Sequence, residues 1–323
     1  MRLRVFVDLK MCPVALRLLR EGTAGHELLL PSTPAPSVLV ASPPDPLLQT
    51  ADVAFGQPDP TTVARAPRLR WVHVSSSSIT RYDTEEIRAA ARQRSLVLSN
   101  SAAVYAEPCA LHTLSFILAE ARRLPEALAS STPGGSEEWH RLREQSVPLS
   151  GQSLLIVGFG AIGGRLVELL APLGMRATGF RRRDRGDEPI PMVPADQLPR
   201  ALGEANHVVN ILPANPESSG FFDDGRFAQF RPGAVFYNIG RGATVDQDAL
   251  LRALRSGRLK AAWLDVTEPE PLPPQHPLRH EANCHITPHV AGGHADESQS
   301  LVRHFLANLR RYEAGEPLMG VVF

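Results

Sequence analysis

Residues 153–174 read SLLIVGFGAIGGRLVELLAPLG, and this stretch decides the fold of the middle of the chain. Its first part, Ser153–Val157, is apolar and rich in β-formers, so it predicts a buried strand. Apolar residues then recur at helical spacing from Ile162 to Leu173, and Gly174 follows where a helix commonly ends. A strand, a glycine-rich turn and a helix in this order are typical of a parallel α/β sheet.

The turn itself, Gly-Phe-Gly-Ala-Ile-Gly at residues 158–163, has the spacing of a phosphate cradle. Gly158 permits the tight turn, Gly160 lets the backbone approach a pyrophosphate, and Gly163 lets helix and strand pack closely. The pyrophosphate would lie at the helix N-terminus, where unpaired N–H groups and the helix dipole favour an anion. We therefore expect a dinucleotide site of the Rossmann type.

The end of the next strand, expected at residues 175–180, bears on which dinucleotide binds. Arg181, Arg182 and Arg183 follow it directly. Arginine suits the 2′-phosphate of NADP, whereas an acidic residue would bind the 2′-hydroxyl of NAD. The neighbouring Asp184 weakens this inference. The sequence thus favours NADP(H) over NAD(H), with a solvated basic loop as the alternative.

Short apolar strands alternate with helices along the rest of this region. We expect them at 207–212, 234–239, 261–265 and 284–287, and the clearest helix is 247–256, with Asp246 as its N-cap. With the two strands above they predict a doubly wound parallel sheet.

The first hundred residues predict a second α/β domain. Its strands are expected at 3–7, 38–41, 53–55 and 71–75. A strongly apolar helix at 106–123 and a last helix at 296–312 would connect the domains, the latter returning to the first one. The expected fold is therefore α/β with two domains: a Rossmann dinucleotide-binding domain, 103–294, inserted in a discontinuous flavodoxin-like substrate domain, 1–102 and 295–323.

Each of the last three expected strands is followed by one polar residue of useful chemistry. Arg241 follows 234–239, Glu270 follows 261–265, and His289 follows 284–287. Because ligands bind at the carboxyl ends of the strands in such sheets, these three side chains should converge. Taken singly, each is more often a surface, cap or packing residue; their shared position downstream of the cradle favours a catalytic site.

Together the three side chains fit the reduction of a 2-oxo acid. Arg241 can hold the substrate carboxylate and polarise the adjoining carbonyl. His289 can donate a proton to the carbonyl oxygen as hydride arrives at carbon 2. Glu270 can orient the His289 ring and favour its protonated form.

The chain is similar to the D-isomer-specific 2-hydroxyacid dehydrogenases over most of 151–293. The stretches that carry the resemblance are GFGAIGGRLVELLAPLGM, FRPGAVFYNIGRGATVDQDALLRAL, LDVTEPEPLPPQHPL and ITPHVAG. Two earlier stretches, LRWVHVSSSSI and NSAAVYAEPCALHTLSFILA, are similar to the family's substrate loop and first interdomain helix. NADP use with small 2-oxo acids is most like the glyoxylate/hydroxypyruvate reductases.

The resemblance implies Arg241, Glu270 and His289 as the catalytic set and a homodimeric assembly. It implies substrate binding by Ser77 and Ser78 together with Arg241 and His289. The full expected set of cofactor-binding residues is Gly158, Gly160, Ala161, Ile162, Gly163, Arg181, Arg182, Leu212, Pro213, Ile239, Gly240, Asp265 and Gly292.

The chain also departs from the family's pattern. Four serines occupy the substrate loop where a glycine and an acidic residue are common, and Leu111 stands where a glutamate is common. Arg181 replaces the usual acidic residue. The first two departures bear on the identity of the substrate and the third on the cofactor. Two alternatives remain open: a dehydrogenase of another small anion, such as formate or phosphonate, and an NAD(H)-sensing binding protein of the corepressor type.

Composition narrows the class of protein further. Lys+Arg and Asp+Glu are both 34 in 323 residues, so the balance suggests neither nucleic acid nor an anionic membrane as a partner. Cys12, Cys109 and Cys284 are few and widely separated, and they predict neither a disulfide framework nor a metal site. No stretch approaches 18 uninterrupted apolar residues, so no transmembrane helix is expected. We expect a cytoplasmic setting.

Overall fold

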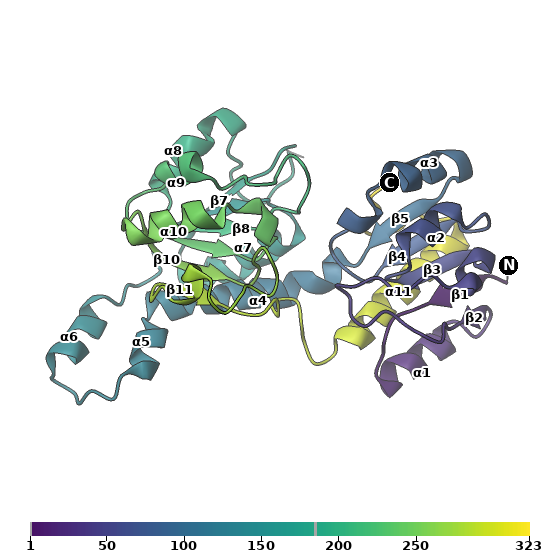
Figure 1. The fold of residues 1–323 in the computed structure, drawn as a ribbon, viewed down its shortest axis with the longest axis horizontal. Coiled ribbons are helices and arrows are strands. Elements are labelled where there is room, and N and C mark those ends of the chain that lie inside the picture. The colour runs from purple at the N-terminus through teal and green to yellow at the C-terminus, as the bar shows by residue number, and fades with distance from the viewer. Residues whose placement is uncertain (1, 184–185) are drawn as a thin grey trace. The chain divides into compact units, whose positions relative to one another are not determined.

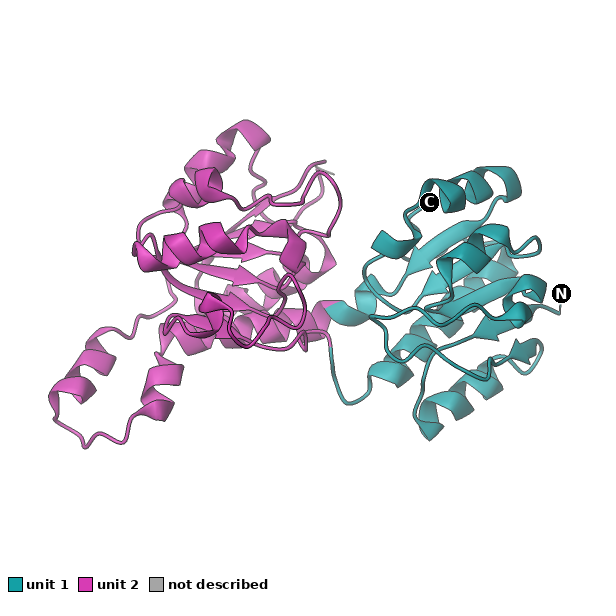
Figure 2. Cartoon of the chain, viewed as in Figure 1, with its two compact units in different colours: residues 1–105, 293–323 teal, residues 106–292 magenta. Residues whose placement is uncertain are grey.

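The computed structural model describes residues 2–183 and 186–323, so Asp184 lies outside the described residues. The chain forms two compact units (Figures 1 and 2). Unit 1 comprises residues 1–105 and 293–323, and unit 2 comprises residues 106–292. Each unit contains one parallel sheet with helices on both faces, which confirms the predicted α/β fold class.

Unit 1 contains a five-stranded parallel sheet in the order β2-β1-β3-β4-β5. Its strands are β1 (Arg4–Val7), β2 (Glu27–Leu29), β3 (Val53–Gly56), β4 (Trp71–Val74) and β5 (Val97–Asn100). Its helices are α1 (Pro13–Gly22), η1 (Pro46–Thr50), α2 (Pro60–Arg65), η2 (Thr80–Tyr82), α3 (Glu85–Arg94) and α11 (Glu297–Ala314).

Helices cover the two faces of this sheet in pairs. Helices α1 and α11 lie against one face, where Phe55 stacks on Phe305 with ring centroids 4.3 Å apart. Helices α2 and α3 cover the other face through Val63 and Ile87, which join a cluster with Val72. All five of these side chains are fully buried, so the hydrophobic effect holds the helices to the sheet.

Unit 2 contains a six-stranded parallel sheet in the order β11-β10-β9-β8-β6-β7. Its strands are β6 (Ser153–Val157), β7 (Arg176–Phe180), β8 (His207–Asn210), β9 (Ala234–Asn238), β10 (Leu259–Leu264) and β11 (Cys284–Ile286). Its helices are α5 (Leu124–Ala129), α6 (Glu137–Glu144), α7 (Ala161–Leu170), η3 (Ala171–Leu173), η4 (Ala195–Gln197), α8 (Leu198–Glu204), α9 (Asp224–Ala228), η5 (Gly242–Thr244), α10 (Gln247–Arg255) and η6 (Pro277–Arg279).

Local sequence explains several of these boundaries. The Asp246 carboxylate accepts hydrogen bonds from the backbone N–H groups of Asp248 and Ala249, both at 3.0 Å, and so begins α10 as expected. Gly257, at φ +72°, follows the end of that helix. Gly174, at φ +71°, ends the α7–η3 segment, in the left-handed region that glycine adopts without strain.

One expectation for unit 1 is wrong, and two of its strands were missed. The predicted strand at 38–41 is wrong: the segment is a turn closed by a hydrogen bond from Val40 N to Ser37 O. Its apolar residues are instead exposed, Leu39 at 44% and Val40 at 50%. Strands β2 and β5 were not expected, because three or four residues carry too little periodicity to separate a strand from a loop.

Helix α4 (Ala102–Ala121) begins four residues before its expected start and ends two residues before its expected end. By length and composition alone it could cross a membrane, and 33% of its most apolar window is buried inside the structure. A core helix of a soluble protein can have the same length and apolar composition. The Glu120 carboxylate is 4% exposed and forms ion pairs with Lys260 and Arg123. These ion pairs hold this end of α4 in unit 2.

Candidate active site

The glycine turn after β6 contains two glycines that the fold requires and one that it does not. A Cβ on Gly158, at φ +92°, would lie 2.8 Å from the Ile211 carbonyl carbon, and one on Gly163 would lie 2.9 Å from the Phe159 ring. A Cβ on Gly160 would meet nothing nearer than 3.9 Å. Gly160 therefore borders open space.

Gly160 is also the N-cap residue of α7, and it has no side chain to accept from the N–H groups of the first turn. Ala161 and Ile162 form that first turn. Open space above a helix N-terminus that lacks a side-chain cap fits a dinucleotide pyrophosphate. The residues present thus suit the cofactor that the sequence predicts.

The arginines after β7 form ion pairs in this structure. Arg181 Nη1 lies 3.2 Å from Glu188 Oε1, and the Arg182 guanidinium contacts the Glu217 carboxylate. The Arg181 side chain is 23% exposed, whereas that of Arg182 is 68% exposed. Glu188 was not singled out from the sequence, since it lies seven residues beyond Arg181.

Arg241 follows β9 in an extended conformation and begins η5. Its Nη1 donates to the carbonyl of Gly240 at 2.6 Å. The two glycines that flank Arg241 are required by the backbone that packs against them. A Cβ on Gly240 would lie 2.7 Å from Leu212 O, and one on Gly242 would collide with the carbonyl of Thr267. Close backbone packing within unit 2 explains both.

Two buried asparagines hold the Arg241 turn in place. The Asn210 amide donates to Asn238 Oδ1 at 2.9 Å and to Thr244 Oγ1 at 2.7 Å. The Asn238 amide donates to Arg241 O at 3.3 Å, and Thr244 Oγ1 donates to the same oxygen at 2.6 Å. Sequence reasoning missed these residues, although an asparagine ends each of β8 and β9.

His289 and Glu270 are in direct contact. His289 Nδ1 lies 2.9 Å from Glu270 Oε1 and 3.0 Å from Oε2. The carboxylate therefore fixes Nδ1 as the hydrogen-bonded nitrogen and leaves Nε2 as the ring nitrogen that can exchange a proton with a ligand. Exposure is partial, at 20% for the His289 side chain and 39% for that of Glu270, so the pair remains open to a ligand.

Asp265, at the end of β10, anchors the segment that carries His289. Its buried carboxylate accepts from Thr287 Oγ1 at 2.6 Å and from the N–H groups of Val290 and Ala291 at 2.9 Å. His289 itself has φ +54°, a conformation that a non-glycine residue adopts at a cost of about 1 kcal/mol or more. Asp265 thus stabilises a strained turn at the candidate site.

His112 of α4 lies beside this anchor. Its Nε2 is 3.3 Å from Thr287 Oγ1 and 3.6 Å from Asp265 Oδ1. Burial lowers the pKa of His112, and the Asp265 carboxylate opposes that effect. A neutral His112 then accepts or donates a single hydrogen bond without adding charge beside Asp265.

The remaining expected site residues are also placed. Leu212 N donates to Asn210 Oδ1 at 3.1 Å, Ile239 is 5% exposed, and the Pro213 carbonyl accepts from Ser218 Oγ at 2.5 Å. Gly292 is the last residue of unit 2. Ser77 and Ser78 lie in unit 1, between β4 and η2.

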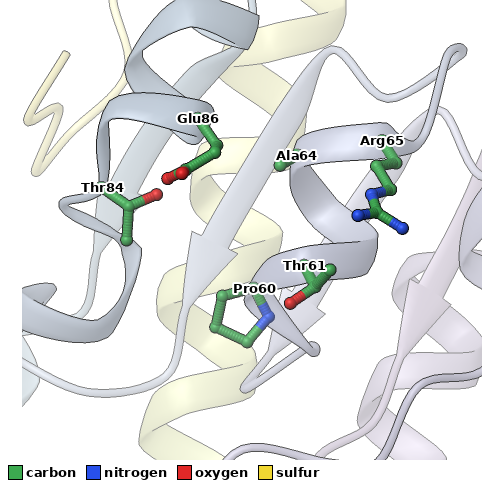
Figure 3. Close-up of a pocket in the computed structure, with 6 residues that line it drawn as sticks. All are labelled: Pro60, Thr61, Ala64, Arg65, Thr84 and Glu86. Carbon is green, nitrogen blue, oxygen red and sulfur yellow. The ribbon is translucent and has the colours of Figure 1, made fainter.

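The serine loop of unit 1 has internal hydrogen bonds. Ser76 Oγ donates to Ser78 O at 2.6 Å, and the Asn100 amide donates to Ser77 O at 3.0 Å. These bonds fix the loop backbone. A separate cavity of about 430 Å³ in unit 1 lies between the starts of α2 and α3 and is lined by Pro60, Thr61, Ala64, Arg65, Thr84 and Glu86 (Figure 3). It contains none of the expected site residues.

Comparisons with known proteins bear on this site. The family model for the NAD binding domain of D-isomer specific 2-hydroxyacid dehydrogenases matches residues 114–291. Human glyoxylate reductase/hydroxypyruvate reductase is 31% identical over 79% of this chain and 77% of its own length. Glyoxylate reductase of Aeropyrum pernix is 33% identical over 79% of this chain and 76% of its own length.

A solved structure extends the likeness to nearly the whole chain. The NADPH-dependent glyoxylate/hydroxypyruvate reductase of Sinorhizobium meliloti, crystallised with NADP and sulfate, has a TM-score of 0.77 and 27% identity, covering 99% of this chain and 98% of its own. The fold and site define an NAD(P)-dependent oxidoreductase. The chain belongs to the D-isomer-specific 2-hydroxyacid dehydrogenase family.

Proposed function

We propose that this protein reduces a small 2-oxo acid, of the glyoxylate or hydroxypyruvate type, to the D-2-hydroxy acid with NADPH. The observation that carries the proposal is the 2.9 Å contact between His289 Nδ1 and Glu270, in the segments after β11 and β10, beside β9, which Arg241 follows. Relatives named glyoxylate and hydroxypyruvate reductase support a small substrate.

Each of the three side chains has one role in this reaction. Arg241 binds the substrate carboxylate and polarises the neighbouring carbonyl through its guanidinium. His289 holds a proton on Nε2 and donates it to the carbonyl oxygen, while Glu270 orients the ring from Nδ1. A bound nicotinamide would supply the hydride to carbon 2. Atoms balance because one hydride and one proton convert the carbonyl to a hydroxyl.

The rest of the expected site completes the proposal. Backbone N–H groups around Ser77 and Ser78 would hold the substrate carboxylate. Asp265 is 1% exposed and accepts three hydrogen bonds within unit 2, so it would act on the nicotinamide through the turn that it anchors. The pyrophosphate would be held at Gly160, Ala161 and Ile162. The other residues that would hold the cofactor are Leu212, Pro213, Ile239, Gly240 and Gly292. Arg181 and Arg182 would bind the 2′-phosphate, which is the reason to favour NADPH.

Steady-state kinetics with the full chain test this function. Glyoxylate, hydroxypyruvate and pyruvate are each offered with NADPH and with NADH, and we expect turnover with at least the first two and higher kcat/KM with NADPH. His289→Ala is the matched inactive control. Cofactor binding without turnover of any 2-oxo acid would contradict the proposal and favour a sensor or another anion as substrate.

Homodimerisation is the assembly we propose. Apolar side chains on α4 and the segment after it are exposed in the single chain: Leu111 44%, Leu118 38%, Leu124 43%, Leu128 84% and Val147 43%. Leu111 and Leu118 are seven residues apart and share one face of α4. Burying this patch against a second copy would remove it from water. Light scattering should give a mass near twice 35.2 kDa, and Leu118→Glu should lower it.

A further inference from the structure

The end of β7 holds a carboxylate as well as arginines, and the two ion pairs there differ. The Arg181–Glu188 pair is shielded, with side-chain exposures of 23% and 4%. The Arg182–Glu217 pair is exposed, at 68% and 66%. An exposed pair separates readily for an incoming ligand, whereas a shielded pair is screened less by water and salt.

Glu188 is brought to Arg181 by a segment that is tied to the edge of the sheet. Gly179 N donates to Pro191 O at 3.0 Å, and Val193 N donates to Gly179 O at 2.7 Å. Glu188 Oε2 also accepts from the N–H of Gly186 at 3.0 Å. The bonds at Pro191 and Val193 therefore fix the segment that follows Glu188, and the N–H of Gly186 helps to hold the carboxylate beside Arg181.

We propose that Glu188 is a specificity-determining residue that sets the margin by which this chain prefers NADPH over NADH. The inference rests on the proposed function only in that the dinucleotide binds along α7 with its adenosine end at the end of β7. A 2′-phosphate carries about two negative charges and is repelled by a nearby carboxylate. A 2′-hydroxyl can donate to the same carboxylate.

Arg181 and Glu188 then act in opposite directions on the two cofactors. Arg181 favours the 2′-phosphate, and Glu188 both opposes it and neutralises part of the Arg181 charge. Arg182 and Arg183, which are exposed, remain available to the phosphate. The chain therefore contains a group for each cofactor, so we infer a narrower preference for NADPH than the arginine run alone implies.

Binding of nucleotides to Glu188→Gln tests the inference without reference to turnover. Isothermal titration would measure Kd for NADPH, NADH, 2′,5′-ADP and 5′-AMP on the full chain. We expect Glu188→Gln to lower the Kd for NADPH and for 2′,5′-ADP by about tenfold, because a repulsive charge is removed. NADH and 5′-AMP should bind as well as before or more weakly.

Two further variants keep the test decisive. Glu204→Gln makes the same change in net charge at an exposed pair with Arg200 (2.8 Å; side-chain exposures 79% and 64%), and it should leave all four Kd values unchanged. Arg181→Gln should weaken NADPH and 2′,5′-ADP while sparing NADH and 5′-AMP. This second prediction stands even if Glu188→Gln fails to fold.

Several outcomes would overturn the inference. If Glu188→Gln folds with an unchanged unfolding midpoint and binds NADPH no more tightly than the wild type, Glu188 does not discriminate between the cofactors. The inference would also be overturned if Arg181→Gln lost affinity for NADPH and NADH equally, or if the wild type bound neither 2′,5′-ADP nor 5′-AMP. A shifted cofactor ratio in a chain that reduces no 2-oxo acid would leave the inference standing and defeat only the proposed function.

Discussion

Both units have polar side chains where their parallel strands end, but the two sets differ in burial. In unit 1, Asp8 and Gln57 are both 0% exposed; Gln57 N donates to Asp8 Oδ1 at 2.7 Å. In unit 2, His289 and Glu270 bond each other while their side chains remain 20% and 39% exposed. Polar groups satisfied within the protein stabilise and position, whereas polar groups that face outward can act on a ligand.

The polar groups of unit 1 form a continuous network. Ser42 Oγ donates to Asp8 Oδ2 at 2.6 Å, and the Gln57 amide donates to Ser75 Oγ at 3.0 Å. Arg81 Nη1 donates to Gln57 Oε1 at 3.2 Å. This network lies directly before the serine loop, so its contribution is to fix that loop. We expect substitutions in unit 2 to affect catalysis most and substitutions in unit 1 to affect stability.

The largest expected effect is that of His289→Ala. Removing the proton donor should lower kcat by about 10³-fold, in the range typical of a general acid. Cofactor affinity should stay within about twofold, because the imidazole acts on the substrate oxygen. Stopped-flow reduction together with a fluorescence titration of NADPH measures both quantities. A large loss of cofactor binding with a modest loss of rate would contradict the assigned role.

Asp265→Asn should have the next largest effect. The amide end of asparagine would face an N–H or O–H donor, so at least one of the three bonds that hold the His289 turn is lost. We expect kcat to fall by roughly 10²-fold and the free energy of unfolding to fall by about 1–3 kcal/mol. Steady-state kinetics and urea unfolding measure the two. Asp248→Asn, at an exposed position, is the control and should change neither.

Glycine substitutions separate ligand binding from folding within unit 2. Gly160→Ala adds a methyl group into open space, so the unfolding midpoint should be retained while NADPH binds at least about tenfold more weakly. Gly163→Ala places its Cβ 2.9 Å from the Phe159 ring and should lower stability by about 1–3 kcal/mol. Thermal melts with and without NADPH distinguish these outcomes. Equal effects of the two variants would refute the distinction.

The smallest effect on catalysis is expected in unit 1, where buried groups make stability depend on pH. Burial lowers the pKa of His73 to about 3. The unfolded chain takes up a proton below about pH 6.5 and the folded chain does not, so stability is complete above that pH and declines on acidification. Because of His73, the free energy of unfolding should fall by about 2 kcal/mol as the pH is lowered from 6.5 to 5.

Asp8 changes the stability of the fold in the opposite direction over a similar pH range. Burial raises its pKa to about 6, against hydrogen bonds from Ser42 and Gln57. The folded chain then binds the proton first, so this group stabilises the fold at low pH and that contribution is lost as pH rises from about 4 to 6. His73→Gln should therefore flatten or reverse the wild-type slope in urea unfolding between pH 6.5 and 5. Exposed His140→Gln should leave the slope unchanged.

Much of unit 2 could be predicted from its sequence because its signals are local. The strand before Gly158, the glycine spacing and the Asp246 cap each depend on a few adjacent residues. Arg241, Glu270 and His289 were predicted as a group because each lies in the segment after a strand-like stretch. The contact between Glu270 and His289 agrees with that prediction.

Only the tertiary structure revealed what supports these residues. Asn210, Asn238 and Asp265 act through bonds to segments far away in the sequence, and a single asparagine or aspartate at a strand end looks the same whether it faces solvent or a neighbouring turn. The reasons for Gly240 and Gly242 also came from backbone that packs against them across the sheet edge.

Sequence by itself determined the class of fold and predicted the dinucleotide turn and the three candidate catalytic side chains, because periodicity, glycine spacing and turn chemistry are short-range properties. Tertiary structure decided the strand order β11-β10-β9-β8-β6-β7, the burial of Asp8 and His73, and the pairing of Arg181 with Glu188. These depend on which distant segments become neighbours, and therefore on the free energy of the whole packed unit.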